Sequence, residues 1–317
     1  MKKRNLLIPL LLLSLSGCQN NVALNSKVFY FDTLVETKLF EGKKENIDDI
    51  KNILSLVDKV SDNFKARDIT NVYSINQTNE DVQVSNELYE LLSLSLSVQN
   101  RGASLFNPLA GSLSNKWKES LKIPQILDET TLNSELLKIS SSSVELKTGN
   151  VVKHNGEAEI DLGGIAKGYA LDKVKSYLDE QSISKYLVNA GSSSILLGEK
   201  DSKDKLFNVG IRDIPNAYLK LNNCFVSSSG ISEQGVTING VTYSHIINPV
   251  TGSAINENDA VIVVTNEGYY GDALSTSMMM NTIDEIKTIE NTYDVKTIVV
   301  KNNKIAYCNE GLTVYYH

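Results

Sequence analysis

The feature that most constrains the fold of this chain is the segment Asp161–Asp172, which reads DLGGIAKGYALD. Its first residues are typical of a strand, two adjacent glycines interrupt the strand, and the remainder is typical of a helix. Glycines let bare backbone approach a ligand, and the first turn of a helix carries partial positive charge, to which Lys167 adds a full charge. The segment therefore predicts a phosphate site, although an ordinary strand-to-helix turn with a surface lysine explains the same residue types.

The N-terminus predicts export and lipid attachment. Met1–Arg4 is basic, and Leu6–Leu15 is an apolar run that fits a signal sequence and is short for a membrane span. The sequence Leu-Ser-Gly-Cys ending at Cys18 has the form of a lipobox. These features predict a signal peptide at 1–17 and a lipid on Cys18; the alternative is an ordinary signal peptide followed by a chance cysteine.

The expected mature chain consists of a lipid-anchored tether at 18–27 and a single domain at 28–317, on the extracytoplasmic face of a bacterial membrane. It would carry 28 basic and 38 acidic side chains, a net charge of −10. This charge argues against nucleic acid as a partner and against electrostatic binding to anionic lipid, which leaves the lipid on Cys18 as the membrane contact. Cys224 and Cys308 are either buried singly or paired in an oxidising compartment.

Hydrophobic periodicity predicts an α+β fold, with helices concentrated in the N-terminal half and a mainly antiparallel sheet in the second half. Asn46 and Ser85 are candidate helix caps, and Asn239-Gly240 is a strong hairpin signal. The glycine spacings of the common nucleotide-binding folds do not occur. Helices are expected from Asn46 onward, at 87–99, at 128–140 and over most of 271–290; strands are expected at 28–40, 144–147, 151–153, 186–189, 194–197, 236–238, 241–243, 260–265 and 295–300.

Asp272 and Thr276 stand one helical turn apart and therefore share a helix face. A carboxylate and a hydroxyl at this spacing suit a hard cation such as Mg²⁺. The competing interpretation is that Asp272 is only a helix cap or a first-turn acid.

Three further segments carry weaker signals. His245 stands at a strand end beside a Pro/Gly turn, where it could bind phosphate, move a proton, or serve only the structure. Asn189–Ser194 is a loop of small residues that could approach a ligand or simply connect two strands. Phe106-Asn-Pro108 could wall a flat ring or pack on the core.

Taken in order, these motifs resemble the ApbE family, whose members are FAD:protein FMN transferases and often lipoproteins. The resemblance extends from about residue 28 to 312 and includes shorter matches at Phe31-Asp-Thr33, Val209–Arg212 and Ser229-Gly230. It implies an ApbE-type fold with FAD in a cleft between its parts. It also implies Mg²⁺-dependent transfer of FMN from FAD to a Thr or Ser hydroxyl of an acceptor protein, with release of AMP.

The resemblance assigns roles to individual residues. The metal would lie between the carbonyl of Gly164, Asp272 and Thr276, with Ser275 as a further candidate. His245 and Asp272 are the candidates for catalysis, and His245 also for phosphate orientation. The FAD contacts would be made by Lys167, Phe31, Leu105, Phe106 and Asn107.

The chain departs from the family pattern on the flavin side. Asn107 replaces the usual aspartate after Phe106, three serines follow Gly191 in place of a second glycine, and Phe64–Asp68 matches poorly. Two alternatives keep the same cleft: a Mg²⁺-dependent FAD pyrophosphatase that uses water as the acceptor, and a non-catalytic lipoprotein that binds FAD.

Overall fold

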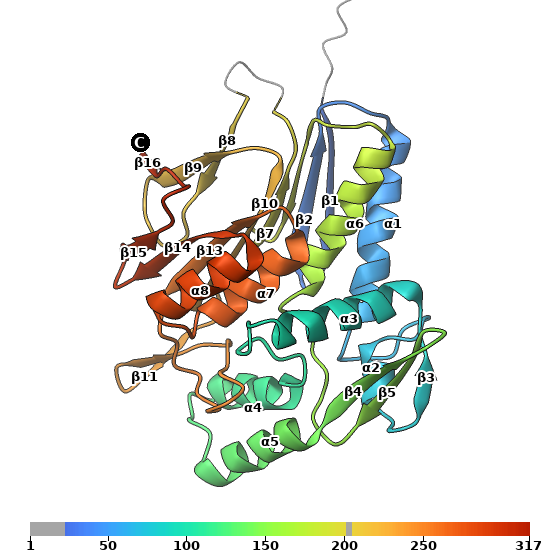
Figure 1. The fold of residues 1–317 in the computed structure, drawn as a ribbon, viewed down its shortest axis with the longest axis vertical. Helices are drawn as coiled ribbons and strands as arrows, with labels where there is room; N and C mark the ends of the chain where they lie inside the picture. The colour runs from blue at the N-terminus through green and yellow to red at the C-terminus, as the bar shows by residue number, and fades with distance from the viewer. Residues whose placement is uncertain (1–22, 201–204) are drawn as a thin grey trace, which may run out of the picture.

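One large antiparallel sheet forms the core of the protein. The computed structural model describes residues 23–200 and 205–317. Eight strands form the sheet, and every neighbouring pair is antiparallel (Figure 1). In spatial order they are β1 (Leu24–Tyr30), β2 (Thr33–Leu39), β6 (Tyr186–Ala190), β7 (Ser194–Leu197), β10 (Cys224–Gly230), β13 (Ala260–Thr265), β14 (Lys296–Lys301) and β15 (Lys304–Cys308).

Both faces of this sheet are covered. Helices lie on one face (Figure 1), and a small sheet shares a second buried cluster with the other. The helices are α1 (Lys44–Ser61), α6 (Ala166–Glu180), α7 (Gly268–Met278) and α8 (Ile283–Tyr293); the small sheet has the order β16 (Tyr315–Tyr316), β9 (Ala217–Leu221), β8 (Phe207–Gly210).

In the central strand β13, apolar residues follow one another without alternating with polar ones. Val261 and Val263 pack under the helices, whereas Ile262 and Val264 belong to the cluster on the opposite face. Successive side chains of a strand point to opposite faces, so a strand covered on both sides needs apolar residues throughout.

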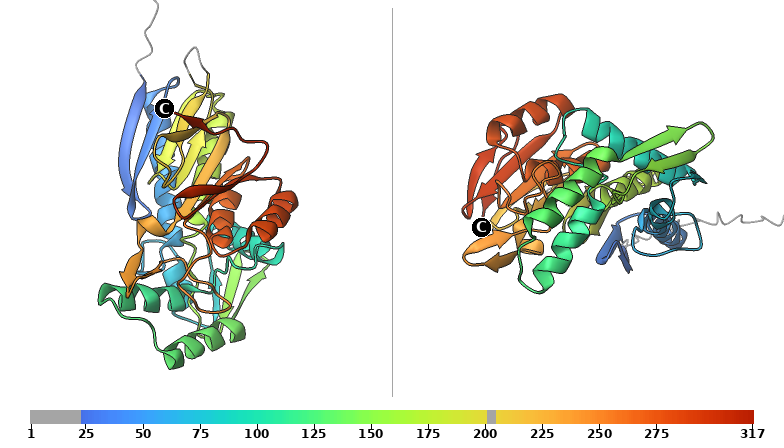
Figure 2. Two further views of the ribbon diagram at one scale, coloured as in Figure 1. Left: turned by 90° about the vertical axis from the view of Figure 1, so that its left-hand side faces the viewer. Right: turned by 90° about the horizontal axis from the view of Figure 1, so that it is seen from below.

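The remaining elements form the lower part of the molecule. There α4 and α5 close the lower end, seen from below in the right panel of Figure 2. These elements are α2 (Val72–Asn76), α3 (Asn86–Asn100), α4 (Gly111–Lys122), α5 (Glu129–Ser141), the sheet β3 (Asp81–Gln83), β5 (Val151–Asn155), β4 (Ser143–Lys147), the short helix η1 (Ile231–Glu233), and the hairpin β11 (Val236–Ile238), β12 (Val241–Tyr243).

The predicted α+β class is confirmed, and the concentration of helices in the first half is confirmed in part, because α6, α7 and α8 follow later. Ser85 accepts a hydrogen bond from the backbone of Leu88 and caps α3 as expected. Asn239 and Gly240 form the turn between β11 and β12, both with positive φ. Helix α4 was not predicted, although Leu113, Trp117 and Leu121 are spaced four residues apart and form its buried face.

Several local predictions were wrong. The stretch 28–40 is a hairpin with a turn at Phe31-Asp32, which lacks a usual turn sequence. Asn46 lies in the first turn of α1 and accepts a hydrogen bond from the backbone of Lys43, the actual cap. In contrast, the prediction that 271–290 is mostly helical is confirmed; the segment holds α7 and α8, and Thr282 and Glu285 form the capping box that begins α8.

The segment before α6 is not a strand. Residues 157–165 have irregular backbone, with hydrogen bonds to other parts of the chain such as that from the Asp161 N–H to the Pro108 carbonyl. The predicted signal peptide and Cys18 lie outside the described residues, and β1 begins at Leu24, inside the predicted tether. No helix among the residues that the structure describes is long and apolar enough to cross a membrane.

Candidate functional site

A single cavity of about 950 Å³ brings together every predicted metal, cofactor and catalytic residue of the described chain. Its walls come from the tip of the β1–β2 hairpin, the helix pair α6 and α7, and the lower part of the molecule. The predicted residues in its lining are Phe31, Leu105, Phe106, Asn107, Gly164, Lys167, His245, Asp272, Ser275 and Thr276.

Helices α6 and α7 meet at their N-terminal ends through a reciprocal contact. Asp272 of α7 accepts a hydrogen bond from the Gly168 N–H of α6 at 2.7 Å. Asp172 of α6 accepts hydrogen bonds from Gly268 and Tyr269 of α7 at 2.7 and 2.8 Å. Each carboxylate thus satisfies free N–H groups at the start of the other helix. The contact fixes Asp272 against the N-terminal end of α6, and both border the cavity.

The close approach of the helices requires glycine at both crossing positions. A methyl group at Gly168 would lie 2.1 Å from the Gly268 carbonyl oxygen, and one at Gly268 would lie 2.4 Å from the Gly168 carbonyl oxygen. Asp272 lies in the second turn of α7 and caps α6 rather than its own helix. This position excludes the alternative that Asp272 is only a cap or a first-turn acid of its own helix.

Asp272 is buried and held by three donors. Besides Gly168, the hydroxyls of Ser194 and Ser227 donate to Asp272 Oδ1 at 2.6 and 2.8 Å. An ionised carboxylate has about four acceptor positions, so one is left for a further ligand. The sequence pointed to the loop that contains Ser194, but it gave no signal for Ser227.

Further oxygen atoms suited to a hard cation line the same cavity as Asp272. A methyl group on Gly164 would lie 3.4 Å from the Thr276 hydroxyl, so these two predicted ligands are neighbours. The Ser275 hydroxyl donates to the Asp272 carbonyl and lies 3.0 Å from the Ser229 hydroxyl. Within 23–200 and 205–317, no group of three or more His, Cys, Asp or Glu side chains forms a metal cluster. A cation here would take hydroxyl and carbonyl oxygens beside one carboxylate, as Mg²⁺ accepts.

His245 is a neutral imidazole on the cavity wall. Burial, with help from the positive charges of Lys118, Lys167 and Arg212, lowers the pKa of His245 to about 4. Its Nε2 is 3.8 Å from Glu233 Oε2, and its buried Nδ1 has no hydrogen-bond partner among the described residues. A neutral imidazole can accept a proton, and an anion beside it would make it a stronger base.

Positive charge gathers around the same space. No carboxylate among the described residues forms an ion pair with Lys167, whereas Arg212 is 2.7 Å from Glu233 and donates to the Ser228 hydroxyl at 3.1 Å. Lys118 also lines the cavity. Arg212 lies in a motif that the sequence singled out, but Lys118 and Glu233 had no distinguishing signal.

The fold and the cavity together define the class of the protein: it is an α+β protein whose cavity combines a buried carboxylate, hydroxyls and lysine charges. The model of the ApbE family matches residues 31–299, and the chain belongs to this family.

Curated relatives carry the name FAD:protein FMN transferase. The protein from Treponema pallidum is 30% identical over 62% of this chain and 60% of its own length. The protein from Klebsiella pneumoniae is 27% identical over 70% of this chain and 72% of its own length.

Solved structures share the fold. The ApbE protein of Thermotoga maritima superposes with a TM-score of 0.76 at 22% identity, covering 93% of this chain and 97% of the other. The flavin transferase ApbE of Vibrio cholerae gives a TM-score of 0.73 at 20% identity with the same coverage.

Proposed function

We propose that this protein transfers FMN from FAD to a Thr or Ser hydroxyl of an acceptor protein and releases AMP. The observation that carries the proposal is the single cavity in which Asp272, Lys167 and His245 meet. The names of the curated relatives support the same activity. A pyrophosphate is strongly anionic, and phosphoryl transfer depends mainly on positioning and charge neutralisation.

The residues present fit a bound Mg²⁺. The free acceptor position of Asp272 and the neighbouring oxygens of Gly164, Ser275 and Thr276 form the set of hard oxygen ligands that this ion prefers. When bound, Mg²⁺ would neutralise negative charge on the pyrophosphate.

The remaining chemistry falls to side chains of the cavity. The acceptor oxygen forms a bond to the phosphorus of the FMN half, and the bond from that phosphorus to the bridging oxygen breaks. AMP leaves with the bridging oxygen. His245, neutral before the reaction, takes the proton of the acceptor hydroxyl. Lys167 and Arg212 offset the charge that develops on the departing phosphate.

The test is to incubate the protein with FAD, Mg²⁺ and a flavoprotein domain that contains a Thr or Ser target, and to weigh the acceptor by mass spectrometry. The expected result is an acceptor heavier by one FMN less one water, with one AMP released per modified acceptor. FMN and AMP free in solution with an unmodified acceptor would instead identify a pyrophosphatase. Unchanged FAD would identify a binding protein without catalysis.

We further propose that the chain is a lipoprotein anchored through Cys18 on the extracytoplasmic face of the membrane. The basic residues, apolar run and lipobox support this proposal. Growth with a labelled fatty acid should label the wild-type protein and leave Cys18→Ser unlabelled. Equal labelling of both would contradict the anchor.

A further inference from the structure

The tip of the β1–β2 hairpin holds a bulky side chain in an unfavourable backbone conformation at the cavity. Phe31 and Asp32 have φ values of 53° and 54°, in the left-handed region that favours glycine and asparagine. Both residues line the cavity. Such a conformation persists only where its surroundings hold it, and it is concentrated at ligand sites.

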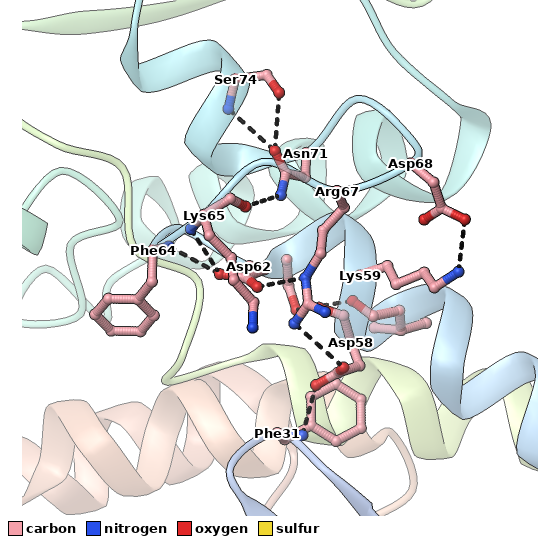
Figure 3. Close-up of polar contacts among 12 residues, drawn as sticks. Phe31, Asp58, Lys59, Asp62, Phe64, Lys65, Arg67, Asp68, Asn71 and Ser74 are labelled. Carbon is pink, nitrogen blue, oxygen red and sulfur yellow. Dashed lines mark hydrogen bonds and ion pairs between the residues drawn. The ribbon is translucent and has the colours of Figure 1, made fainter.

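A charged residue of α1 holds this turn. The Phe31 N–H donates to Asp58 Oδ1 at 2.6 Å (Figure 3). Asp58 is half-buried, and burial raises its pKa, against the lowering effects of this hydrogen bond and of Arg67. Arg67 Nη2 lies 3.9 Å from Asp58 Oδ2.

The same arginine connects the turn to a second part of the rim. Arg67 Nε donates to Asp62 Oδ2 at 2.6 Å. Asp62 Oδ1 in turn accepts hydrogen bonds from the backbone of Phe64 and Lys65 at 2.8 and 3.3 Å, as Figure 3 shows. Asp58, Arg67 and Asp62, here called the rim cluster, therefore link the hairpin tip to the loop after α1, and both segments line the cavity.

We propose that the rim cluster positions Phe31 and the loop 62–67 so that they hold a planar ring of the bound nucleotide. The inference rests on the proposed function for the identity of the ligand as a flavin dinucleotide. The members of the cluster are positioning residues, because they act on the bound ring through Phe31, whose aromatic side chain would stack on it. The planar ring is either the isoalloxazine or the adenine of FAD, since both stack on an aromatic side chain.

The test compares Asp58→Ala with the wild-type protein by calorimetric titration with FAD, FMN, AMP and inorganic pyrophosphate. We expect about tenfold weaker binding of FAD and of one mononucleotide, and unchanged binding of pyrophosphate, which has no ring. An effect on FMN assigns the isoalloxazine, and an effect on AMP assigns the adenine. Asp58→Asn keeps an acceptor for the Phe31 N–H and should bind within about threefold of the wild type.

Asp68→Ala is the matched control, because Asp68 follows the same loop but is exposed and pairs with Lys59. It should bind every ligand as the wild type does. Unchanged FAD binding by Asp58→Ala would overturn the inference, as would equal weakening of FAD and pyrophosphate or an Asn variant as weak as the Ala variant. Failure of the wild-type protein to bind FAD would instead overturn the proposed function and the ligand on which the inference rests.

Discussion

Asp272 shows at the residue scale what sequence spacing can predict. The spacing to Thr276 predicted a shared helix face, and both residues line the cavity. The residue is only 5% exposed, and its side chain accepts three hydrogen bonds. Those donors come from α6, β7 and β10, so no local pattern in the sequence could reveal them.

Replacing Asp272 with Asn should lower Mg²⁺-dependent FMN transfer at least about 100-fold, because it removes the only carboxylate proposed for the metal. The amide nitrogen of Asn cannot accept a hydrogen bond, so one donor around this position would lose its acceptor. This loss should lower the free energy of unfolding by about 1–3 kcal/mol. Transfer assays over a range of Mg²⁺ and urea unfolding measure the two effects. Asp284→Asn, at an exposed position of α8, is the control, and wild-type activity of Asp272→Asn at limiting Mg²⁺ would contradict the metal site.

His245 should make stability depend on pH. Its pKa is about 4 in the folded protein, below the ordinary value of 6.5. Between these values the unfolded chain binds a proton that the folded protein does not, so the free energy of unfolding should fall as pH falls from 6.5 towards 4. Denaturant unfolding at several pH values should show this slope in the wild type and a smaller slope in His245→Gln; equal slopes would remove His245 as its source.

The same residue should affect catalysis. An anionic substrate beside the imidazole raises its pKa, so the acidic limb of kcat should lie at higher pH than that of kcat/KM. In His245→Gln, the pH profiles of kcat and kcat/KM should both lack the acidic limb, and most of the activity should be lost. Identical limbs for kcat and kcat/KM in the wild type would argue against His245 as the proton acceptor.

At the element scale, the pairing of α6 with α7 is the arrangement that the sequence did not show. Each helix carries a glycine and, four residues later, the aspartate that caps the other helix. The local signals that did succeed, such as the Ser85 cap and the Asn239-Gly240 turn, depend on neighbours in sequence. The hairpin tip at Phe31-Asp32 escaped prediction because Asp58, far along the chain, holds it.

Gly168→Ala tests the helix pairing. Alanine normally stabilises a helix relative to glycine, but here its methyl group would meet the Gly268 carbonyl oxygen at 2.1 Å. We expect a loss of about 1–3 kcal/mol in the free energy of unfolding, together with reduced FMN transfer, because the N-terminal end of α6 and Asp272, which border the cavity, must separate. Gly210→Ala is the control, since nothing lies within 4 Å of that position and its φ is ordinary. A stabilised Gly168→Ala protein would contradict the close crossing.

At the scale of the whole molecule, the order of the strands decides whether Cys224 and Cys308 can form a disulfide. Both thiols are free in the structure. Cys308 is in register with Ile298, then Ile262, then Ser228 across successive strands, so three strand spacings separate it from β10. That is roughly 14 Å, whereas a disulfide needs Cα atoms within about 7 Å.

Thiol titration of a Cys18→Ser protein checks this arrangement. Two reactive thiols should appear in denaturant without reductant, and the thermal midpoint should not change when a reductant is added. Burial raises the pKa of Cys224 to about 12, so this thiol should react very slowly in the folded protein. Thiols that appear only after reduction would contradict the strand order.

By itself, the sequence determined the α+β class, most helices, some hairpins such as β11–β12, and the residue types of the site, because caps, turns and periodicity act between near neighbours. Only the tertiary structure decided that Asp272 is held by Gly168, Ser194 and Ser227, that two helices cap each other, and that Asp58 supports Phe31. The physical reason is that a buried carboxylate must find its donors wherever the fold brings them, and those donors lie far apart in the sequence.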